Sequence, residues 1–213
     1  MEELHGLAIP RTLEDACDPR RLALLIYDMQ VGILRQIDDH ERVVANVARM
    51  LEGARAAHAR TFFTRHVTLP TGLMGASQLR MWMTWQGAAR AADVVSPFPP
   101  DAPQTQLVPE LTPTADEAVL DKITLSAFEG TPLDIVLRDC GITSVAIAGV
   151  ALEVGIEPTA RHAADLGYVP IVVTDACGAG NAAAGERALA TLEFGGDSIL
   201  TDVTTFTRAL SGA

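Results

Sequence analysis

The sequence predicts an α/β fold in which helices cover both faces of a central parallel sheet. Short β-rich runs alternate with helical segments along the chain, and no internal repeat interrupts this alternation. The 213 residues most simply correspond to one domain over residues 1–213. With 48% hydrophobic residues, the chain is also able to bury a sizeable core.

The first half of the chain begins with its clearest strand. Residues 22–27 (LALLIY) form a continuous apolar run that ends at Asp28, which is typical of a strand buried on both faces of a parallel sheet. The elements expected after it are a helix over 43–59, a strand over 60–65 and a helix over 74–92. Residues 96–117 hold half of the twelve prolines. Because proline interrupts both helices and strand ladders, we expect an irregular excursion there.

The second half alternates more regularly. The segment Thr131-Pro132-Leu133-Asp134 predicts a helix start, with Thr131 as N-cap and Pro132 at the first helical position. Glycines at 167 and at 195–196 predict the ends of two further helices. The expected elements are strands over 118–121, 144–148, 170–174 and 198–200, and helices from 131 onward, over 158–166 and over 183–194.

Charge and cysteine content exclude several classes of function. The net charge of −11 repels nucleic acid and anionic membrane surfaces, and Arg20-Arg21 is the only adjacent basic pair. The leader over residues 1–20 is acidic where a signal peptide would be basic and apolar. No run approaches the roughly 18 apolar residues of a membrane span. Three cysteines without a CxxC pattern predict a reduced, cytoplasmic protein.

Candidate site residues follow several of the predicted strands. Asp28 follows the first strand and Lys122 the third, while a glycine-containing segment, 149–155, follows the fourth. Parallel sheets bind ligands at the carboxyl ends of their strands, so these residues are expected to converge. The alternative is that Asp28 caps a helix and that Lys122 is merely solvated.

Three segments resemble the isochorismatase-like hydrolase superfamily, which has a cysteine hydrolase fold. They are LLIYDMQ at 24–30, KITLSAFEGTPL at 122–133 and AGVALEVGIEPTARHAA at 148–164. The resemblance covers about residues 22–200 and implies a Rossmann-like three-layer sandwich. It also implies catalytic roles for Asp28 and Lys122, and a cis peptide bond between Val150 and Ala151.

The position of the family's cysteine nucleophile is occupied by Gly155, which excludes acyl-enzyme chemistry there. True isochorismatases in this family also carry glycine, and there the aspartate protonates an alkene carbon before water captures the cation. By resemblance, Gly155 belongs to the catalytic set and leaves space for substrate or water. A cysteine introduced at position 155 is expected to be reactive. A neighbouring Lys122 favours the charged form of Asp28, so its role as acid or as base stays open.

Further residues are expected around the substrate. The predicted substrate-binding set is Ala151, Phe128, Trp82, Trp85 and Glu153. Backbone N–H groups near Ala151 and Gly155 are expected to form an anion site. The alternatives are that the tryptophans belong to the core and that Glu153 only favours a helix N-terminus. His66 has no second histidine nearby in sequence, so neither a metal nor another cofactor is expected.

These observations predict a cofactor-independent small-molecule hydrolase, with isochorismatase-type ether hydrolysis as the example without a thiol. One alternative is a pseudoenzyme that binds a small ligand or a partner. Another is an amidohydrolase that uses Cys177, because Cys140 precedes the fourth strand and Cys17 lies in the leader. A charged fraction of only 20% and the Trp82/Trp85 helix favour a homodimer or homotetramer.

Overall fold

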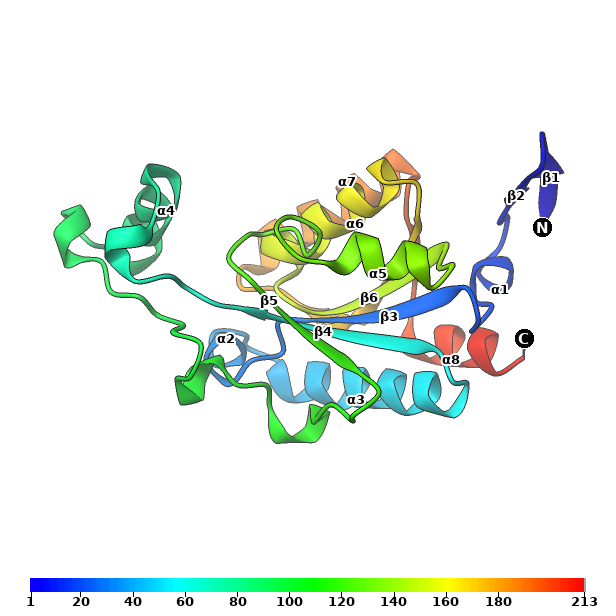
Figure 1. Cartoon of the computed structure of the whole chain (residues 1–213), viewed down its shortest axis with the longest axis horizontal. Coiled ribbons are helices and arrows are strands. Elements are labelled where there is room, and N and C mark those ends of the chain that lie inside the picture. Colours follow the sequence, from blue (N-terminus) through cyan, green and yellow to red (C-terminus); the bar gives the residue numbers. More distant parts are fainter. Residues whose placement is uncertain (213) are drawn as a thin grey trace.

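The computed structural model describes residues 1–212 and is built around a six-stranded parallel sheet (Figure 1). The strands lie in the order β5-β4-β3-β6-β7-β8. They are β3 (Leu22–Tyr27), β4 (Arg60–His66), β5 (Ala118–Lys122), β6 (Ser144–Val150), β7 (Val169–Gly178) and β8 (Ile199–Thr201). The chain runs outward from β3 to β5 and returns to β6 on the other side of β3. The carboxyl ends of β3 and β6 therefore form the switch point where such sheets bind ligands.

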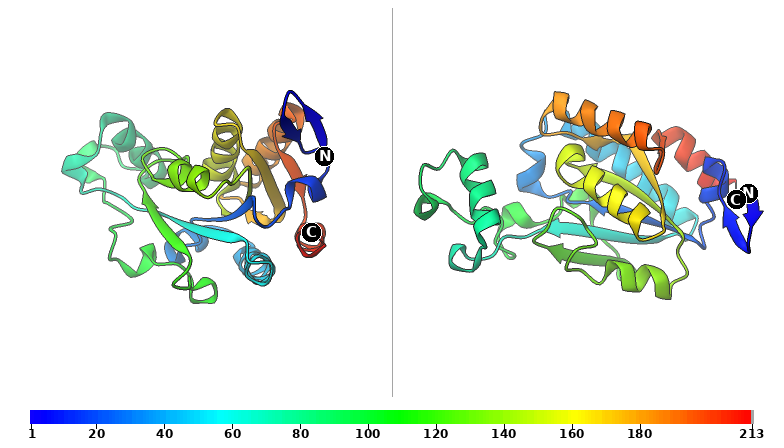
Figure 2. Two further views of the ribbon diagram at one scale, coloured as in Figure 1. Left: turned by 45° about the vertical axis from the view of Figure 1, so that its right-hand side comes forward. Right: turned by 90° about the horizontal axis from the view of Figure 1, so that it is seen from above.

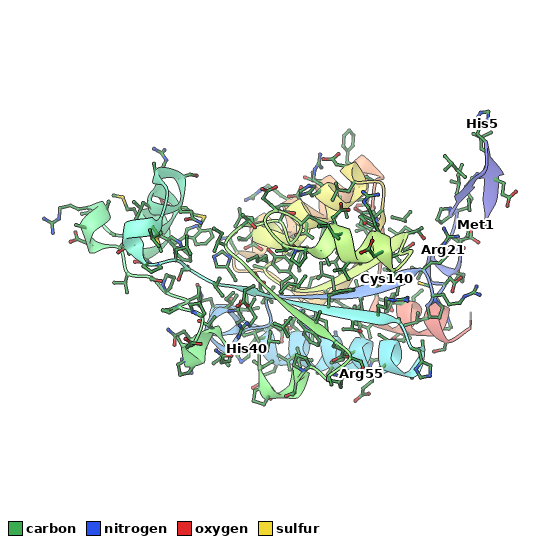
Figure 3. All side chains as sticks on the ribbon, viewed as in Figure 1. Met1, His5, Arg21, His40, Arg55 and Cys140 are labelled. Atoms are coloured by element: carbon green, nitrogen blue, oxygen red, sulfur yellow. The ribbon has the colours of Figure 1, made fainter. Side chains whose placement is uncertain are left out.

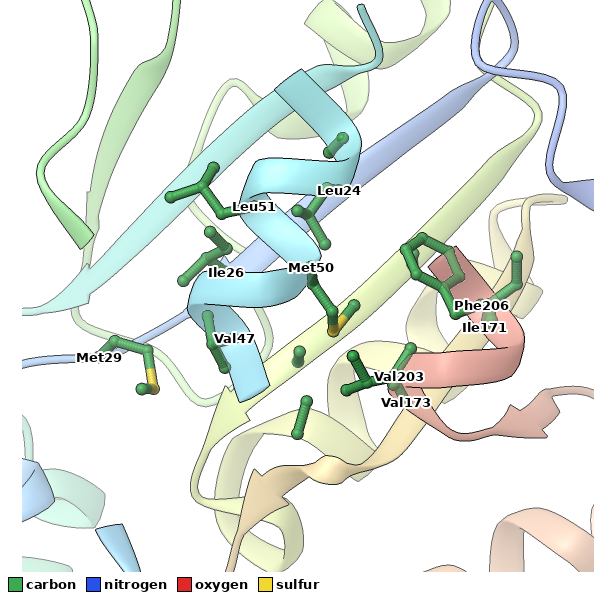
Figure 4. Packing of buried hydrophobic residues seen from close by; sticks show 14 of the residues in the cluster. Leu24, Ile26, Met29, Val47, Met50, Leu51, Ile171, Val173, Val203 and Phe206 are labelled. Atoms are coloured by element: carbon green, nitrogen blue, oxygen red, sulfur yellow. The ribbon is translucent and has the colours of Figure 1, made fainter. Parts of the chain in front are cut away.

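Helices cover both faces of the sheet, which confirms the predicted α/β fold. One face carries α3 (His40–Ala56) and α8 (Val203–Ser211), and the other carries α5 (Leu133–Asp139), α6 (Glu157–Asp165) and α7 (Ala182–Gly195). Alternate residues of β3 face the two cores. Leu24 and Ile26 pack toward Met50 and Phe206 (Figure 4), whereas Leu25 and Tyr27 face the other side. Because both faces are covered, all six residues of β3 are buried.

The structure corrects several expected boundaries. The helix expected from Thr131 begins at Leu133 with Pro132 as its N-cap, although the Thr131 hydroxyl still accepts from the Leu133 N–H at 3.2 Å. The last long strand, β7, continues to Gly178. The remaining elements, which the sequence does not predict, are β1 (Glu2–Leu4), β2 (Leu7–Ile9), α1 (Leu13–Ala16), α2 (Val31–Leu34), a π-helix over Leu152–Ile156, and α8.

Residues 69–100 project beyond the carboxyl end of the sheet, far from both termini (Figure 2). This projecting segment contains α4 (Ala76–Gln86) and two 3-10 turns, η1 (Thr71–Leu73) and η2 (Ala91–Asp93). The helix ends ten residues after it begins because Gly87 adopts the left-handed conformation that terminates helices. The segment packs its own small apolar cluster around Trp82 and Phe98.

The return from the projecting segment is irregular, as its prolines predict. It contains the 3-10 turns η3 (Pro103–Thr105) and η4 (Pro109–Leu111). Backbone hydrogen bonds attach it beside the end of β3: the Val108 N–H donates to the Met29 carbonyl at 3.0 Å, and the Val31 N–H to the Gln106 carbonyl at 3.0 Å. Within residues 1–212, no helix combines the length and apolarity needed to cross a membrane.

Candidate active site

Asp28 lies directly after β3, and its carboxylate is fixed by a neighbouring strand. Its backbone has a φ of 48°, a left-handed conformation that aspartate tolerates better than most residues. The Thr64 hydroxyl of β4 donates to Oδ1 of Asp28 at 2.6 Å and accepts from the Asp28 N–H at 3.1 Å. Because both residues are buried, the carboxylate is held in one orientation.

The last residue of β5, Lys122, reaches the other oxygen of this carboxylate. Its Nζ lies 2.7 Å from Oδ2 of Asp28 and also donates to the Thr124 carbonyl at 3.1 Å. The side chains are only 1% and 5% exposed, so this ion pair is almost free of solvent screening. Burial lowers the pKa of Lys122, and the negative charge of Asp28 opposes that shift.

A cavity of about 440 Å³ opens over this ion pair. Six of the predicted site residues line it: Asp28, Lys122, Gly155, Ala151, Trp82 and Trp85. Phe128 and Glu153 do not. Phe128 packs against His162 and Tyr168, with ring centroids 5.5 and 5.9 Å away. Oε1 of Glu153 instead accepts from the Asn181 N–H at 2.8 Å.

Gly155 does not leave the open space that the resemblance implies. A Cβ atom built on Gly155 would come closer than 3.0 Å to the hydroxyl and two ring carbons of Tyr27. The Tyr27 ring is therefore where a side chain at position 155 would be. Its hydroxyl donates to the Leu125 carbonyl, and burial raises its pKa well above the usual value, so the phenol is neutral. Cysteine at position 155 is thus not simply accommodated, contrary to expectation.

The turn after β6 confirms one expectation and corrects another. The Val150–Ala151 peptide bond is cis, which confirms the expectation from the resemblance. The Gly155 N–H, however, donates to the Ala151 carbonyl at 2.9 Å as part of the π-helix. This N–H is used by the turn itself, so the anion site expected there cannot use it.

His66, at the end of β4, lines the cavity, although the sequence analysis considered it only as a metal ligand. Its ring lies against those of Trp82 and Phe98, with centroids 6.1 and 6.3 Å away. Its backbone N–H and carbonyl are both bound by the Gln30 amide, at 2.6 and 3.0 Å. Burial, with the charge of Lys122, lowers the pKa of His66 to about 4, so the imidazole is neutral at pH 7.

Thr64 was missed because a threonine within a strand-like run resembles an ordinary strand residue, and His66 because it was considered only as a metal ligand. The available signal was position, since both lie near the carboxyl end of a strand beside Asp28. The structure also bears on metals. Within the part of the chain that it describes, residues 1–212, no three His, Cys, Asp or Glu side chains are arranged to hold a metal ion.

None of the three cysteines lines the cavity. Cys177 is buried, with Sγ 3.2 Å from the Val173 carbonyl, and burial raises its pKa to about 12. Burial likewise raises the pKa of Cys17 to about 12. Cys140 lies at the end of α5, away from the projecting segment (Figure 3).

Comparison with known sequences identifies relatives of this chain. Residues 22–205 match the Isochorismatase domain family. The chain is 32% identical over 159 residues to the uncharacterized isochorismatase family protein YwoC of Bacillus subtilis, covering 75% of this chain and 78% of that protein. It is 30% identical over 173 residues to enterobactin synthase component B of Escherichia coli, covering 79% of this chain. The match spans only 56% of the length of that relative.

A shorter match and the solved structures complete the comparison. The ureidoacrylate amidohydrolase RutB of Klebsiella pneumoniae is 44% identical over 111 residues, 51% of this chain and 46% of that protein. A cysteine hydrolase from Pseudomonas syringae superposes with a TM-score of 0.80 at 22% identity, covering 92% of this chain and 95% of that one. An isochorismatase family protein from Burkholderia thailandensis gives a TM-score of 0.74 at 27% identity, covering 90% and 96%.

Proposed function

Because the chain belongs to the isochorismatase family, whose members are hydrolases, we propose that it hydrolyses a small molecule in the cavity over Asp28 and Lys122. The observation that carries the proposal is the buried ion pair, 2.7 Å long, that faces an aromatic-walled cavity. Position 155, on the same cavity, carries no side chain that could act as a nucleophile. The proposed reaction therefore proceeds without a covalent thiol intermediate at this position, and we propose that it needs no cofactor.

Ether hydrolysis of the isochorismatase type fits this set of groups. The Asp28 carboxylate would first take up a proton from solvent, and the resulting carboxyl group would protonate the alkene carbon of a vinyl ether, leaving a cation stabilised by the ether oxygen. Water would then add to the cationic carbon and return its proton to the Asp28 carboxylate, and the resulting hemiketal would separate into a carbonyl compound and an alcohol. The Lys122 ammonium would stabilise the carboxylate between the two proton transfers.

The cavity also indicates the kind of substrate. Asp28, Lys122 and His66 line it together with aromatic side chains, among them Trp82 and Phe98. Its other polar side chains include Gln36 and Gln86. Cavities of this kind orient a mainly apolar molecule by a few polar groups. We therefore propose a small, partly apolar substrate whose scissile group faces the ion pair. Thiol-dependent hydrolysis through Cys177 is disfavoured, because a thiol with a pKa of about 12 is not ionised at pH 7.

Substrate screening tests the proposal. Vinyl ethers, amides and ureides would be offered to the wild type, to Asp28→Asn and to Asp121→Asn, a control for an acid that pairs with Arg65 outside the cavity. We expect turnover of at least one vinyl ether, a loss of about 10²–10⁴-fold in Asp28→Asn, and little change in the control.

Turnover that survives in Asp28→Asn would contradict the proposed role of Asp28. Compounds that raise the melting temperature without forming product in any screen would favour the pseudoenzyme alternative. In that case the cavity binds a ligand, and the hydrolase proposal for this chain is wrong.

A further inference from the structure

The contact between Tyr27 and Gly155 joins the ends of two neighbouring strands. Tyr27 is the last residue of β3, and Gly155 lies in the π-helix that follows β6. The Tyr27 ring faces the same side of the sheet as this turn, because β3 residues alternate between the two faces. Both residues line the cavity, so the place where a Cβ at position 155 would lie is also part of the substrate site.

Two contacts hold the Tyr27 ring in this place, and strand pairing fixes its backbone. Its hydroxyl is bound by the Leu125 carbonyl, and the Lys122 ammonium lies over its face, 4.3 Å from the ring centroid. At the backbone, Tyr27 pairs with Gly149 of β6. A Cβ on Gly149 would overlap the Tyr27 carbonyl. The Gly149 backbone φ of 131° also favours glycine at this position. The absence of a side chain at Gly149 thus leaves room for the Tyr27 backbone, and its absence at Gly155 leaves room for the Tyr27 ring.

We propose that Tyr27 is the specificity-determining residue of this cavity, because its ring occupies the space that a side-chain nucleophile at position 155 would need. The inference rests on the proposed function for its catalytic meaning, but the contact itself does not depend on any substrate. Acyl transfer to a thiol requires sulfur to bond to the carbonyl carbon while the amine leaves with a proton. With the Tyr27 ring in place, sulfur has no room at position 155, so this position could not support that intermediate even if it carried a cysteine.

A cycle of stability measurements tests the contact. Gly155→Ala is expected to lower the melting temperature when Tyr27 is present, because the added methyl group overlaps the ring. In the Tyr27→Val background the same substitution is expected to cause no further loss. Gly178→Ala is the matched control, since its Cβ would meet Ile37 and Val150 but not Tyr27. Its loss should be the same in both backgrounds.

Equal losses from Gly155→Ala in the two backgrounds would overturn the proposal, and so would no loss in either. If Tyr27→Val alone does not fold, Tyr27→Leu repeats the cycle with a side chain that fills more of the space. In the Tyr27→Leu background, Gly155→Ala is again expected to cause no further loss. A loss there equal to that in the wild-type background would contradict the proposal.

Thiol labelling then tests the consequence for specificity. Iodoacetamide at pH 7 would be reacted with Gly155→Cys and with the double variant Tyr27→Val/Gly155→Cys, and the wild type would give the rate of the native cysteines. In the double variant the new thiol gains space close to the Lys122 ammonium, which lowers a thiol pKa from its usual value of about 8.5. We expect labelling at position 155 at least about tenfold faster in the double variant than in Gly155→Cys. Equal rates would show that Tyr27 does not block the position.

These measurements distinguish the two levels of the proposal. If the wild type hydrolyses nothing in the screen while the stability cycle shows the coupling, the proposed function fails and the Tyr27 assignment stands. If Asp28→Asn loses turnover while the cycle shows no coupling, the proposed function stands and the Tyr27 assignment fails.

Discussion

The cavity has a floor and an outer wall, which are built in different ways. The floor consists of side chains at the carboxyl ends of β3, β4 and β5, among them Asp28 and Lys122. Asp28 is buried and joined to Lys122, and to Thr64 outside the cavity lining, by hydrogen bonds of 2.6–2.7 Å. The outer wall comes from the projecting segment, in which Trp82 packs in a small cluster and Trp85 is half-exposed. Under the proposed function, the rigid sheet carries the proton chemistry, and the separately packed segment contacts the rest of the substrate.

The largest expected effect concerns the ion pair of the floor. Lys122→Met leaves the Asp28 carboxylate buried without a counter-charge, and we expect the free energy of unfolding to fall by about 3–5 kcal/mol. The control is Asp121→Asn, which breaks an ion pair of the same 2.7 Å length between β4 and β5 whose side chains are 20% and 38% exposed. It should cost about 1 kcal/mol or less in urea unfolding. Equal losses would show that burial does not distinguish the two pairs.

The main core and the projecting segment are also expected to differ in how far the effect of a substitution spreads. Phe63→Ala, in β4, removes a fully buried ring from the main core and should cost about 3–5 kcal/mol. Trp82→Ala removes a larger ring, but from the small cluster of the projecting segment. We expect a loss of less than about 1 kcal/mol in global unfolding, with faster amide exchange confined to residues 69–100. Exchange that increases throughout the sheet in Trp82→Ala would contradict this separation.

A third prediction concerns the pH dependence of stability. It depends on His66, which ends β4 and packs against Trp82 and Phe98 of the projecting segment. The pKa of His66 is about 4 in the fold, against about 6.5 for an ordinary histidine. As the pH falls from 6.5 to 4, the unfolded chain binds a proton that the folded chain does not. This site therefore lowers the free energy of unfolding by up to roughly 3 kcal/mol across that window, and contributes no pH dependence above it.

Urea unfolding at several pH values measures this effect. His66→Asn should show a shallower fall in stability between pH 6.5 and pH 4 than the wild type. His58→Asn, at an exposed histidine whose left-handed backbone asparagine tolerates, should keep the wild-type slope. Identical slopes for all three proteins would mean that the fold does not lower the pKa of His66.

The smallest expected effect on stability lies on the outside of the projecting segment. Leu73, Trp85 and Val95 are 70%, 50% and 67% exposed, and we propose that a second copy of the chain covers them in a homodimer or homotetramer. Leu73→Lys should then shift the sedimenting species toward the monomer. A surface substitution of this kind should change the unfolding free energy of the monomer by no more than about 0.5 kcal/mol. A wild type that sediments as a monomer at micromolar concentration would contradict the proposal.

The sequence predicts the central strands β3 and β6 best because they are buried on both faces. A run such as Leu22–Tyr27 has no polar position, so its identity as a central strand follows from composition alone. The helix α8 was missed for the opposite reason. Its sequence, VTTFTRALS, is rich in β-branched residues, and packing of Val203, Phe206 and Leu210 against the core outweighs that local preference.

The site could be predicted only as far as strand ends reveal it. Asp28 and Lys122 lie at strand ends, so their convergence was expected. In the structure, Nζ of Lys122 lies 2.7 Å from Oδ2 of Asp28. The overlap between Tyr27 and position 155 depends on the register of β3 against β6 and on the path of the π-helix, which no local pattern encodes. Glu153 illustrates the same limit, because the turn directs its carboxylate to the Asn181 N–H instead of the cavity.

The central claim is that Asp28, paired with Lys122, carries the chemistry and that no thiol does. The most direct measurement is the ratio of turnover rates of Cys177→Ala and Asp28→Asn on the best substrate of the wild type. We predict that Cys177→Ala stays within about twofold of the wild type, while Asp28→Asn falls at least about 100-fold below it. A Cys177→Ala protein that is inactive beside an active Asp28→Asn protein would contradict the account.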